Sequence, residues 1–367
     1  MTPLRWGFVS TAQIGKRNWQ AVKNSGNGIV AGVASRSRDR ASEFIDECQG
    51  LCSFEQRPEA FADYLDLIRS DSIDAVYIPL PTGTRKQYVI AAAEAGKHVM
   101  CEKPCASNSA DLQEMVDACR RNNVQFMDGV MYMHTARLGQ LRQVLDDGAS
   151  VGDLKRITCQ FSFCADEAWF RSDIRLDSAL EPQGCLGDLG WYCIRFVLWA
   201  MNWKMPRRVT ATTLTERHRE GSPGPVPVEF SAELFFPGDV SAAFYCSFIT
   251  HHQQWANVSG NRGYVHVNDF VLPYAGDETR FEVSNADFIM DGCDFSMIDH
   301  RRTVTVAESG NSTENSEETN LFRNFSELAL SGQPDDHWCE ISLKTQQVLD
   351  ACLEAARSSS QTVELVG

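Results

Sequence analysis

The sequence lacks any run of about 18 apolar residues, the length that a transmembrane helix requires. It also lacks the layout of a signal peptide, because a strand-like pattern begins at Leu4. We therefore expect a soluble, cytoplasmic protein with no membrane partner.

Closely spaced cysteine pairs are also missing. The chain has 13 cysteines, an odd number, with no CxxC pair, and the nearest spacings join Cys48 to Cys52 and Cys101 to Cys105. This pattern favours reduced thiols over a disulfide framework, and we expect no metal site.

Positive charge is scarce, with 34 Lys and Arg residues against 49 Asp and Glu residues and a net charge of −15. Such a chain repels nucleic acid and anionic lipid. We therefore expect a small molecule as the partner, and no nucleic acid.

A chain of 367 residues is too long for one ordinary core and predicts about two domains. In residues 1–129, strand-like segments alternate with helical patterns, which predicts an α/β domain with a doubly wound parallel sheet of the Rossmann type. The predicted strands are Leu4–Val9, Ile29–Ala34, Ala75–Leu80, His98–Cys101 and Val124–Met127.

Residues 130–367 have a different rhythm, because strands follow strands with few helices between them. This order predicts an α+β domain with a large, mostly antiparallel open sheet. We expect a homo-oligomer that forms through this sheet, with outward side chains of Ser241–Thr250 as candidates, although a sandwiched core is the alternative for them. The acidic segment Glu308–Thr319 is expected on the surface. Two helices, Leu321–Leu330 and Leu343–Ala356, close the chain and could pack back on the first domain.

The segment Ala95–Pro104 (AGKHVMCEKP) carries the clearest chemical signal. It has the pattern of a buried strand that ends in Glu102 and Lys103 and is stopped by Pro104, which cannot continue the hydrogen-bond ladder and could follow a cis bond. Ligands of open α/β sheets bind beyond the carboxyl ends of the strands, so Lys103 is predicted to point into that crevice. The alternative is a surface Glu–Lys pair after a core strand.

A weak nucleotide-binding signal follows the first strand. Of the three glycines in a dinucleotide fingerprint, this turn has only Gly15, with Ser10 and Ala12 at the other two positions. Small residues still let the backbone approach a phosphate. We expect cofactor contacts from the whole turn, which consists of Ser10, Thr11, Ala12, Gln13 and Ile14.

The second strand ends in Ser35, Arg36 and Arg38. An NAD-selective site usually offers an acidic side chain at this position. A hydroxyl and two guanidinium groups favour the 2′-phosphate of NADP instead, so NADP is predicted to be preferred over NAD. The alternative is that both arginines are solvated loop charges.

The phrase GDLGWY in the second half lies at the start of a helix predicted over Leu186–Ala200. In such a helix Asp188 and Tyr192 are one turn apart on the same face. An ordinary explanation is an acidic residue at the positive end of a helix, followed by a core tyrosine.

Together, AGKHVMCEKP after a βαβ series and GDLGWY later in the chain resemble the Gfo/Idh/MocA family of oxidoreductases. The resemblance implies an NAD(P)-dependent enzyme that acts on a hydroxyl or carbonyl carbon of a sugar, polyol or cyclic diol. It implies that Lys103, Asp188 and Tyr192 form the catalytic group. The implied cofactor contacts are Pro79, Leu80, Pro81, Thr82, Arg85, Glu102 and Lys103, and the implied substrate contacts are Asp128, Asp188 and Tyr192. Arg175, on the loop before the GDLGWY helix, is a further candidate for substrate contact, with a solvated loop charge as the alternative.

Within this group we expect Tyr192 to act as acid and base and Lys103 as its electrostatic partner. A nearby ammonium favours the phenolate and would lower the pKa of tyrosine from about 10. Asp188 would orient Lys103 or bind a neighbouring substrate hydroxyl. The single fingerprint glycine and an unusual turn at Thr82–Arg85 (TGTR) keep one alternative open, a catalytically silent nucleotide-binding regulator or scaffold of the same fold.

Overall fold

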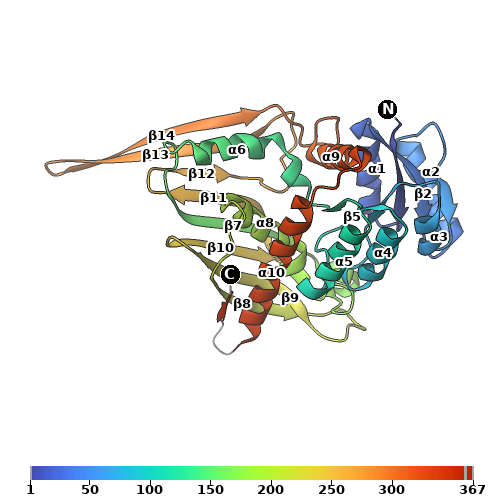
Figure 1. The fold of residues 1–367 in the computed structure, drawn as a ribbon. Helices are drawn as coiled ribbons and strands as arrows, with labels where there is room; N and C mark the ends of the chain where they lie inside the picture. Colours follow the sequence, from blue (N-terminus) through green and yellow to red (C-terminus); the bar gives the residue numbers. More distant parts are fainter. Residues whose placement is uncertain (1, 359–361, 366–367) are drawn as a thin grey trace.

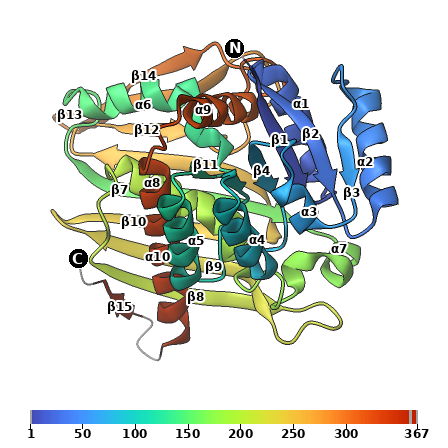
Figure 2. The same ribbon diagram turned by 45° about the vertical axis from the view of Figure 1, so that its right-hand side comes forward.

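The computed structural model describes residues 2–358 and 362–365 of the chain. Figure 1 shows two sheets side by side, with helices packed around the N-terminal sheet and across one side of the C-terminal sheet. Helices α9 and α10 lie at the junction of the two sheets in both views (Figures 1 and 2).

The N-terminal sheet has six parallel strands in the order β3-β2-β1-β4-β5-β6, which confirms the doubly wound prediction. The strand order changes direction between β1 and β4, the point at which open α/β sheets bind ligands. All four residues of β4 are buried, as expected for a parallel strand covered on both faces. The strands are β1 (Leu4–Val9), β2 (Gly28–Ala34), β3 (Glu59–Phe61), β4 (Ala75–Ile78), β5 (His98–Cys101) and β6 (Phe126–Asp128), and the helices are α1 (Ile14–Ser25), α2 (Arg38–Leu51), α3 (Tyr64–Arg69), α4 (Thr82–Glu94) and α5 (Ser109–Arg121).

The C-terminal sheet has nine strands in the order β14-β13-β12-β11-β7-β10-β9-β8-β15. Among the strand pairs of the described part of the chain, only β7–β10 is parallel, so the prediction of a mostly antiparallel sheet is confirmed. The strands are β7 (Leu154–Cys164), β8 (Arg208–Arg217), β9 (Val226–Phe236), β10 (Val240–Ser247), β11 (Ile249–Gly260), β12 (Tyr264–Val267), β13 (Thr279–Asp291), β14 (Asp294–Val306) and β15 (Thr362–Glu364).

Burial alternates along the C-terminal strands. In β9, Phe230, Ala232 and Leu234 are buried beneath the helices, and Ser231 and Glu233 between them remain partly exposed. This period of two means that one face of the sheet forms the core and the other faces away from the helices.

The chain crosses back to the N-terminal sheet at its end. Trp6 of β1 packs against Phe322 and Phe325 of α9, with ring centroids 5.1 and 4.8 Å apart. The Asp350 carboxylate of α10 accepts a 2.6 Å hydrogen bond from the Ser109 amide of α5.

No helix in residues 2–358 is both long and apolar enough to cross a membrane. The helices of this half are α6 (Ala136–Asp146), α7 (Glu167–Ser172), α8 (Trp191–Ala200), α9 (Glu317–Ser331) and α10 (His337–Arg357).

Helix α3 begins only at Tyr64, because Phe61 ends β3 and the Asp63 carboxylate caps the helix. The strand expected over Ser241–Thr250 is two strands, β10 and β11, which separate at Phe248.

The acidic segment that was expected on the surface is partly buried instead. Glu308 and Glu317 are each 2% exposed. Glu308 accepts hydrogen bonds from the amide of Ala136 at 2.9 Å and from the hydroxyl of Thr135. Composition shows the polarity of a segment but not the partners that allow it to be buried.

Strand β14 was not predicted. Strand β13 continues well beyond Arg280–Val283, the segment whose sequence pattern predicts a strand. The two strands pair without a register shift, from Thr279 opposite Val306 to Asp291 opposite Asp294. Their distal part forms a two-stranded arm that projects from the body (Figure 1).

Candidate active site

A cleft of about 820 Å³ lies between the two sheets, beyond the carboxyl ends of β1, β4 and β5. Residues 12–14 of the first turn line one part of it, and Phe161 and Phe163 of β7 line another. The volume falls within the usual range of ligand pockets. The position agrees with the crevice predicted from the strand pattern.

The first turn has the geometry of a nucleotide-binding turn despite its missing glycines. Ser10 has φ of 148°, a backbone conformation that glycine adopts more easily, and its hydroxyl accepts a 3.1 Å hydrogen bond from the Ala12 amide. Helix α1 starts at Ile14 with no side-chain cap and no acidic residue in its first turn. Its amino end therefore offers backbone N–H groups and positive potential to an anion.

The one fingerprint glycine, Gly15, lies where α1 packs closely against α2. A Cβ at Gly15 would lie 3.1 Å from the Phe44 ring of α2. Close packing therefore accounts for the one fingerprint glycine that the turn keeps.

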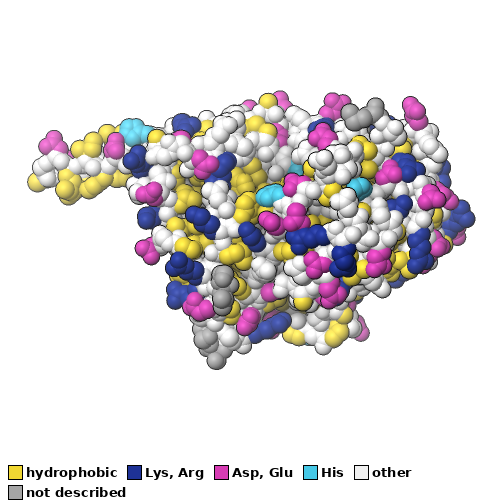
Figure 3. All heavy atoms as spheres, in the orientation of Figure 1, with side chains coloured by type: hydrophobic (Ala, Val, Ile, Leu, Met, Phe, Trp, Pro, Cys, Tyr) yellow, Lys and Arg dark blue, Asp and Glu magenta, His cyan; other side chains and the backbone are white. Residues whose placement is uncertain are grey.

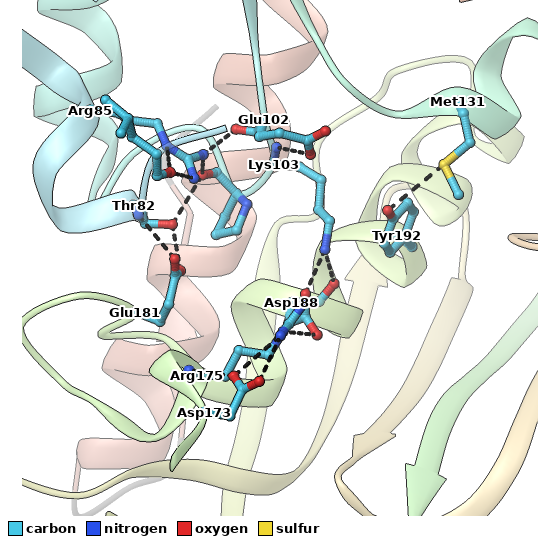
Figure 4. A network of polar contacts seen from close by, with 12 residues as sticks. Thr82, Arg85, Glu102, Lys103, Met131, Asp173, Arg175, Glu181, Asp188 and Tyr192 are labelled. Carbon is cyan, nitrogen blue, oxygen red and sulfur yellow. Dashed lines mark hydrogen bonds and ion pairs between the residues drawn. The ribbon is translucent and has the colours of Figure 1, made fainter. Parts of the chain in front are cut away.

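The loop after β5 is held in place by a buried arginine. The Arg85 guanidinium donates to the carbonyl of Leu80 at 2.9 Å and to the carbonyls of Glu102 and Pro104 (Figure 4). The Lys103–Pro104 bond is cis. Arg85 lines the cleft, but its hydrogen bonds to backbone give it a role in shaping the loop that sequence analysis did not foresee.

Lys103, Asp188 and Arg175 form one network across the cleft (Figure 4). Lys103 Nζ donates to Asp188 Oδ1 and to the Asp188 carbonyl, both at 2.7 Å, and Arg175 Nε donates to Asp188 Oδ2 at 2.8 Å. Burial alone would raise the pKa of the Asp188 carboxyl, but Arg175 and Lys103 together lower it to about 2. Asp188 is therefore a carboxylate at neutral pH and holds the lysine ammonium in the cleft.

Asp188 lies in an irregular turn that precedes α8. Residues Leu186–Gly190 form a π-helical turn before α8, whereas sequence analysis predicted one regular helix over Leu186–Ala200. A Cβ at Gly187 would lie 3.1 Å from Pro104, so the absence of a side chain lets this turn approach the loop of Lys103.

Tyr192 lies beside the lysine, as predicted, but its electrostatics differ from the prediction. Lys103 Nζ is 4.8 Å from the centre of the Tyr192 ring, and among the described residues the hydrogen bond of the tyrosine hydroxyl goes to Met131 Sδ alone, at 3.8 Å. Burial raises the pKa of Tyr192 well above its ordinary value, and the carboxyl groups of Glu102, Asp188 and Glu317 raise it further. The expected lowering toward phenolate is not seen in this geometry, because burial and the three carboxyl groups act in the opposite direction.

Asp128 does not contact the cleft, although it was predicted to contact substrate. Its carboxylate is fully buried, accepts hydrogen bonds from the Arg195 guanidinium, and also accepts a 3.2 Å bond from Trp191 Nε1. Arg195 comes from α8, so the pair ties the end of β6 to the second half of the chain.

The unusual turn at Thr82–Arg85 is also explained by packing. The Thr82 hydroxyl donates to Glu181 Oε2 at 2.6 Å, and its amide donates to Glu181 Oε1 at 3.0 Å (Figure 4). A Cβ at Gly83 would lie 2.1 Å from the carbonyl oxygen of Ala179. This turn therefore joins α4 to the segment before the π-helical turn, and Thr82 is buried, 2% exposed.

The predicted site residues fall into two groups. Ser10, Thr11, Ser35, Arg36, Arg38, Thr82 and Asp128 are not among the residues that line the cleft. Ser35 is 4% exposed, whereas Arg36 and Arg38 are exposed at the end of β2. The predicted residues that do line the cleft are Ala12, Gln13, Ile14, Pro79, Leu80, Pro81, Arg85, Glu102, Lys103, Arg175, Asp188 and Tyr192.

Several cleft residues were not singled out from the sequence. Phe161, Phe163 and His252 form part of the wall opposite the first turn, and Arg17 of α1 pairs with Glu318 of α9. The alternation of β7 places Phe161 and Phe163 on the buried face and was a usable signal. Arg17 and Glu318 are 301 positions apart, so no local pattern could pair them.

Comparison with known proteins gives matches along most of the chain. Residues 4–130 match the family model described as "Oxidoreductase family, NAD-binding Rossmann fold", and residues 138–266 match the "GFO/IDH/MocA C-terminal domain". Human trans-1,2-dihydrobenzene-1,2-diol dehydrogenase is 30% identical over 268 residues, which cover 71% of this chain and 73% of that protein. D-xylose 1-dehydrogenase (NADP(+)) 2 of Haloferax volcanii is 30% identical over 265 residues, covering 72% and 76%.

The fold is shared with a solved 3-ketoreductase from Actinomadura kijaniata, whose structure is a complex with NADP and TDP-benzene. The TM-score is 0.80 at 23% identity, with 96% of this chain and 98% of that chain covered.

Asp128→Asn should destabilise the protein strongly, because it leaves the Arg195 guanidinium buried without its counter-charge. We expect a loss of about 3–5 kcal/mol in the free energy of unfolding, measured by urea denaturation. Asp46→Asn breaks the exposed pair with Arg57 and serves as control, with an expected change of about 0–1 kcal/mol. Equal stability of the two variants, with a raised KM for Asp128→Asn alone, would instead place Asp128 at the substrate.

Proposed function

This chain belongs to the Gfo/Idh/MocA oxidoreductase family, and from that premise we propose that it is an NADP-dependent dehydrogenase or reductase. It transfers a hydride between nicotinamide and a hydroxyl or carbonyl carbon of a sugar, polyol or cyclic diol. The observation that carries the proposal is the meeting of Lys103, Asp188 and Tyr192 in one cleft beside the uncapped end of α1.

The residues present fit a dinucleotide. The bare amino end of α1 and the backbone of Ala12 and Gln13 suit a pyrophosphate, and the cleft continues from there past Glu102 to Lys103. When bound, the nicotinamide supplies the hydride chemistry. Arg36 and Arg38 at the end of β2 suit a 2′-phosphate, in line with the Haloferax relative, which is named for NADP.

Tyr192 is the proposed acid and base. Its pKa lies well above the ordinary range, so at neutral pH the hydroxyl keeps its proton and can donate it to a carbonyl oxygen that is being reduced. The weak contact with Met131 leaves that hydroxyl available to a substrate. Lys103 is the electrostatic partner, and its ammonium, oriented by Asp188, stabilises negative charge that develops on the same oxygen.

Arg175 is proposed to assist at the substrate end. It lines the cleft, and its Nη1 also contacts Asp173 at 3.2 Å. Two carboxylates therefore fix the guanidinium beside the place where a substrate hydroxyl would lie.

The alternative of a catalytically silent regulator has no support among the relatives, which are named as enzymes. Its main argument, the altered turn, is explained by the packing of Thr82 and Gly83.

We further propose that the protein works in a reducing, cytoplasmic setting and associates through its C-terminal sheet. All thirteen cysteines are free thiols, as a reducing compartment would maintain them. One face of that sheet carries partly exposed side chains, which leaves it available to another subunit.

Tyr192→Phe should lower kcat for carbonyl reduction by roughly 10²- to 10⁴-fold, because it removes the proton donor and keeps the ring beside Lys103. The Kd for NADPH, followed by the fluorescence of the eight tryptophans, should stay within about twofold of the parent value. A variant that keeps parental kcat, while Lys103→Met loses it, would exchange the two proton roles. Binding of NADPH with no turnover on any sugar, polyol or diol would favour the silent regulator.

The pH profile provides a separate check on the protonation state. The raised pKa of Tyr192 means that the donor stays protonated as the pH rises, so kcat for reduction should remain level through about pH 10, the ordinary pKa of tyrosine. A fall that begins near neutral pH in the parent and disappears in Tyr192→Phe would show that the tyrosine titrates low, contrary to this geometry.

Arg36→Ala should raise the KM for NADP by about tenfold or more and leave the KM for NAD nearly unchanged, because only NADP carries the 2′-phosphate. Steady-state kinetics with both cofactors measures this, and Arg69→Ala, on the surface at the end of α3, is the control. Equal use of NAD and NADP by the parent protein would contradict the assignment.

A further inference from the structure

One polar side chain of the cleft, His252 of β11, is not engaged by the rest of the protein. It is the only histidine among the described residues that line the cleft, and its ring makes no hydrogen bond or ion pair with any of them. Its neighbour Phe161 contacts the His252 ring with centroids 6.4 Å apart and the Tyr192 ring with centroids 5.6 Å apart. One aromatic ring therefore separates His252 from the proposed acid and base.

An irregularity in the sheet sets the position of His252. The register of β11 against β7 shifts between Ile249 and Gln253, so His252 lies in a stretch without a partner in the described pairing of the two strands. The Ser162 hydroxyl of β7 donates a 2.9 Å hydrogen bond to the carbonyl of His251 and holds this stretch in place. Bulges of this kind re-aim side chains beside active sites. The backbone therefore presents the imidazole to the cleft from a fixed position.

The wall around His252 is apolar. Phe161 and Phe163 of β7 lie beside it, and Leu272 also lines the cleft. The buried side chain of Gln254 fixes Leu272 through two hydrogen bonds to its backbone, each of 2.6 Å. In ligand pockets, apolar walls supply contact area, and a few polar groups fix the orientation of the ligand. His252 is placed to be such a group.

The charged groups of the cleft leave little for an anionic substrate. Every lysine and arginine among the described cleft residues is already engaged by a carboxylate or by backbone carbonyls. These are Arg17, Arg85, Lys103 and Arg175. On the face shown in Figure 3, Lys and Arg side chains likewise lie among Asp and Glu side chains. With a net charge of −15, the protein would also repel an anion as it approached, so a neutral substrate fits best.

An imidazole suits a hydroxyl group, because one ring nitrogen can donate a hydrogen bond and the other can accept one. Resting on the proposed function, we propose that His252 is a specificity-determining residue. It hydrogen-bonds a hydroxyl of a neutral substrate at the edge remote from the carbon that exchanges the hydride. Tyr192 and Lys103 bind the oxygen on the reacting carbon, and Phe161 packs against the substrate ring between them. The favoured substrates are therefore rings with hydroxyls on both edges, over diols with hydroxyls on one edge only.

The test measures binding to the full chain loaded with NADPH, by calorimetry. The probes are two polyhydroxylated rings, myo-inositol and 1,5-anhydro-D-glucitol, and one diol, trans-cyclohexane-1,2-diol. None of them has a carbonyl group, so NADPH cannot reduce them and binding is measured without turnover.

His252→Phe keeps an aromatic ring and removes both nitrogens. It should raise the Kd of the polyol that the parent binds more tightly by about 3- to 10-fold and leave the Kd of the diol within about twofold. His252→Gln keeps a donor and an acceptor and should restore most of the polyol affinity. His251→Phe is the matched control, because His251 is also exposed but does not line the cleft, and its Kd values should equal those of the parent. An unchanged Kd for NADPH in all three variants shows that they are folded.

Three results would overturn the role of His252. They are parental polyol binding by His252→Phe, an equal rise in Kd for the polyol and the diol, and a parent complex that binds neither polyol. Failure of the proposed function looks different. In that case the polyols bind and the His252 variants behave as expected, but the parent protein transfers no hydride from either polyol, or from any other sugar or diol, to NADP.

Discussion

The ion pair between Lys103 and Asp188 is the interaction on which the site depends. Lys103 follows the last residue of a buried parallel strand, and Asp188 lies in a π-helical turn of the other half of the chain. Both side chains are largely buried, so the attraction between them is weakly screened, and the cost of leaving either one alone is high. The pair therefore fixes the two halves relative to each other at the point where Tyr192 and the lysine meet.

Several contacts around that pair serve the same purpose. Arg85 holds the loop of Lys103 through backbone carbonyls, Glu181 holds Thr82, and Asp128 holds Arg195. The contacts of Glu181 and Arg195 join the N-terminal half to segments after residue 180. Those of Arg85 stay within the N-terminal half. Thr82 and Asp128 thus both contribute to packing between the halves.

The distribution of polar and apolar groups is unusual in two places, a buried carboxyl near the cleft and exposed apolar side chains on the arm. Glu317 is buried with neither oxygen hydrogen-bonded within the described chain, and burial raises its pKa to about 8. Together with Glu102 and Asp188 it contributes to the high pKa of Tyr192, so the site favours a protonated phenol. On the arm the reverse holds, because Phe288 and Met290 face water. The first arrangement suits proton donation.

The sequence by itself determined the doubly wound sheet and the antiparallel second sheet, because strand periodicity encodes them locally, whereas the convergence of Lys103, Asp188 and Tyr192 was predicted from the resemblance that two short phrases carry. It did not determine the protonation of Tyr192, the contact of Asp128 with Arg195 or the burial of Glu317. Those properties depend on partners such as Arg195 that are distant in the chain, and a pKa or a salt bridge is set by the groups within a few ångströms in space. Only the tertiary structure brings those groups together.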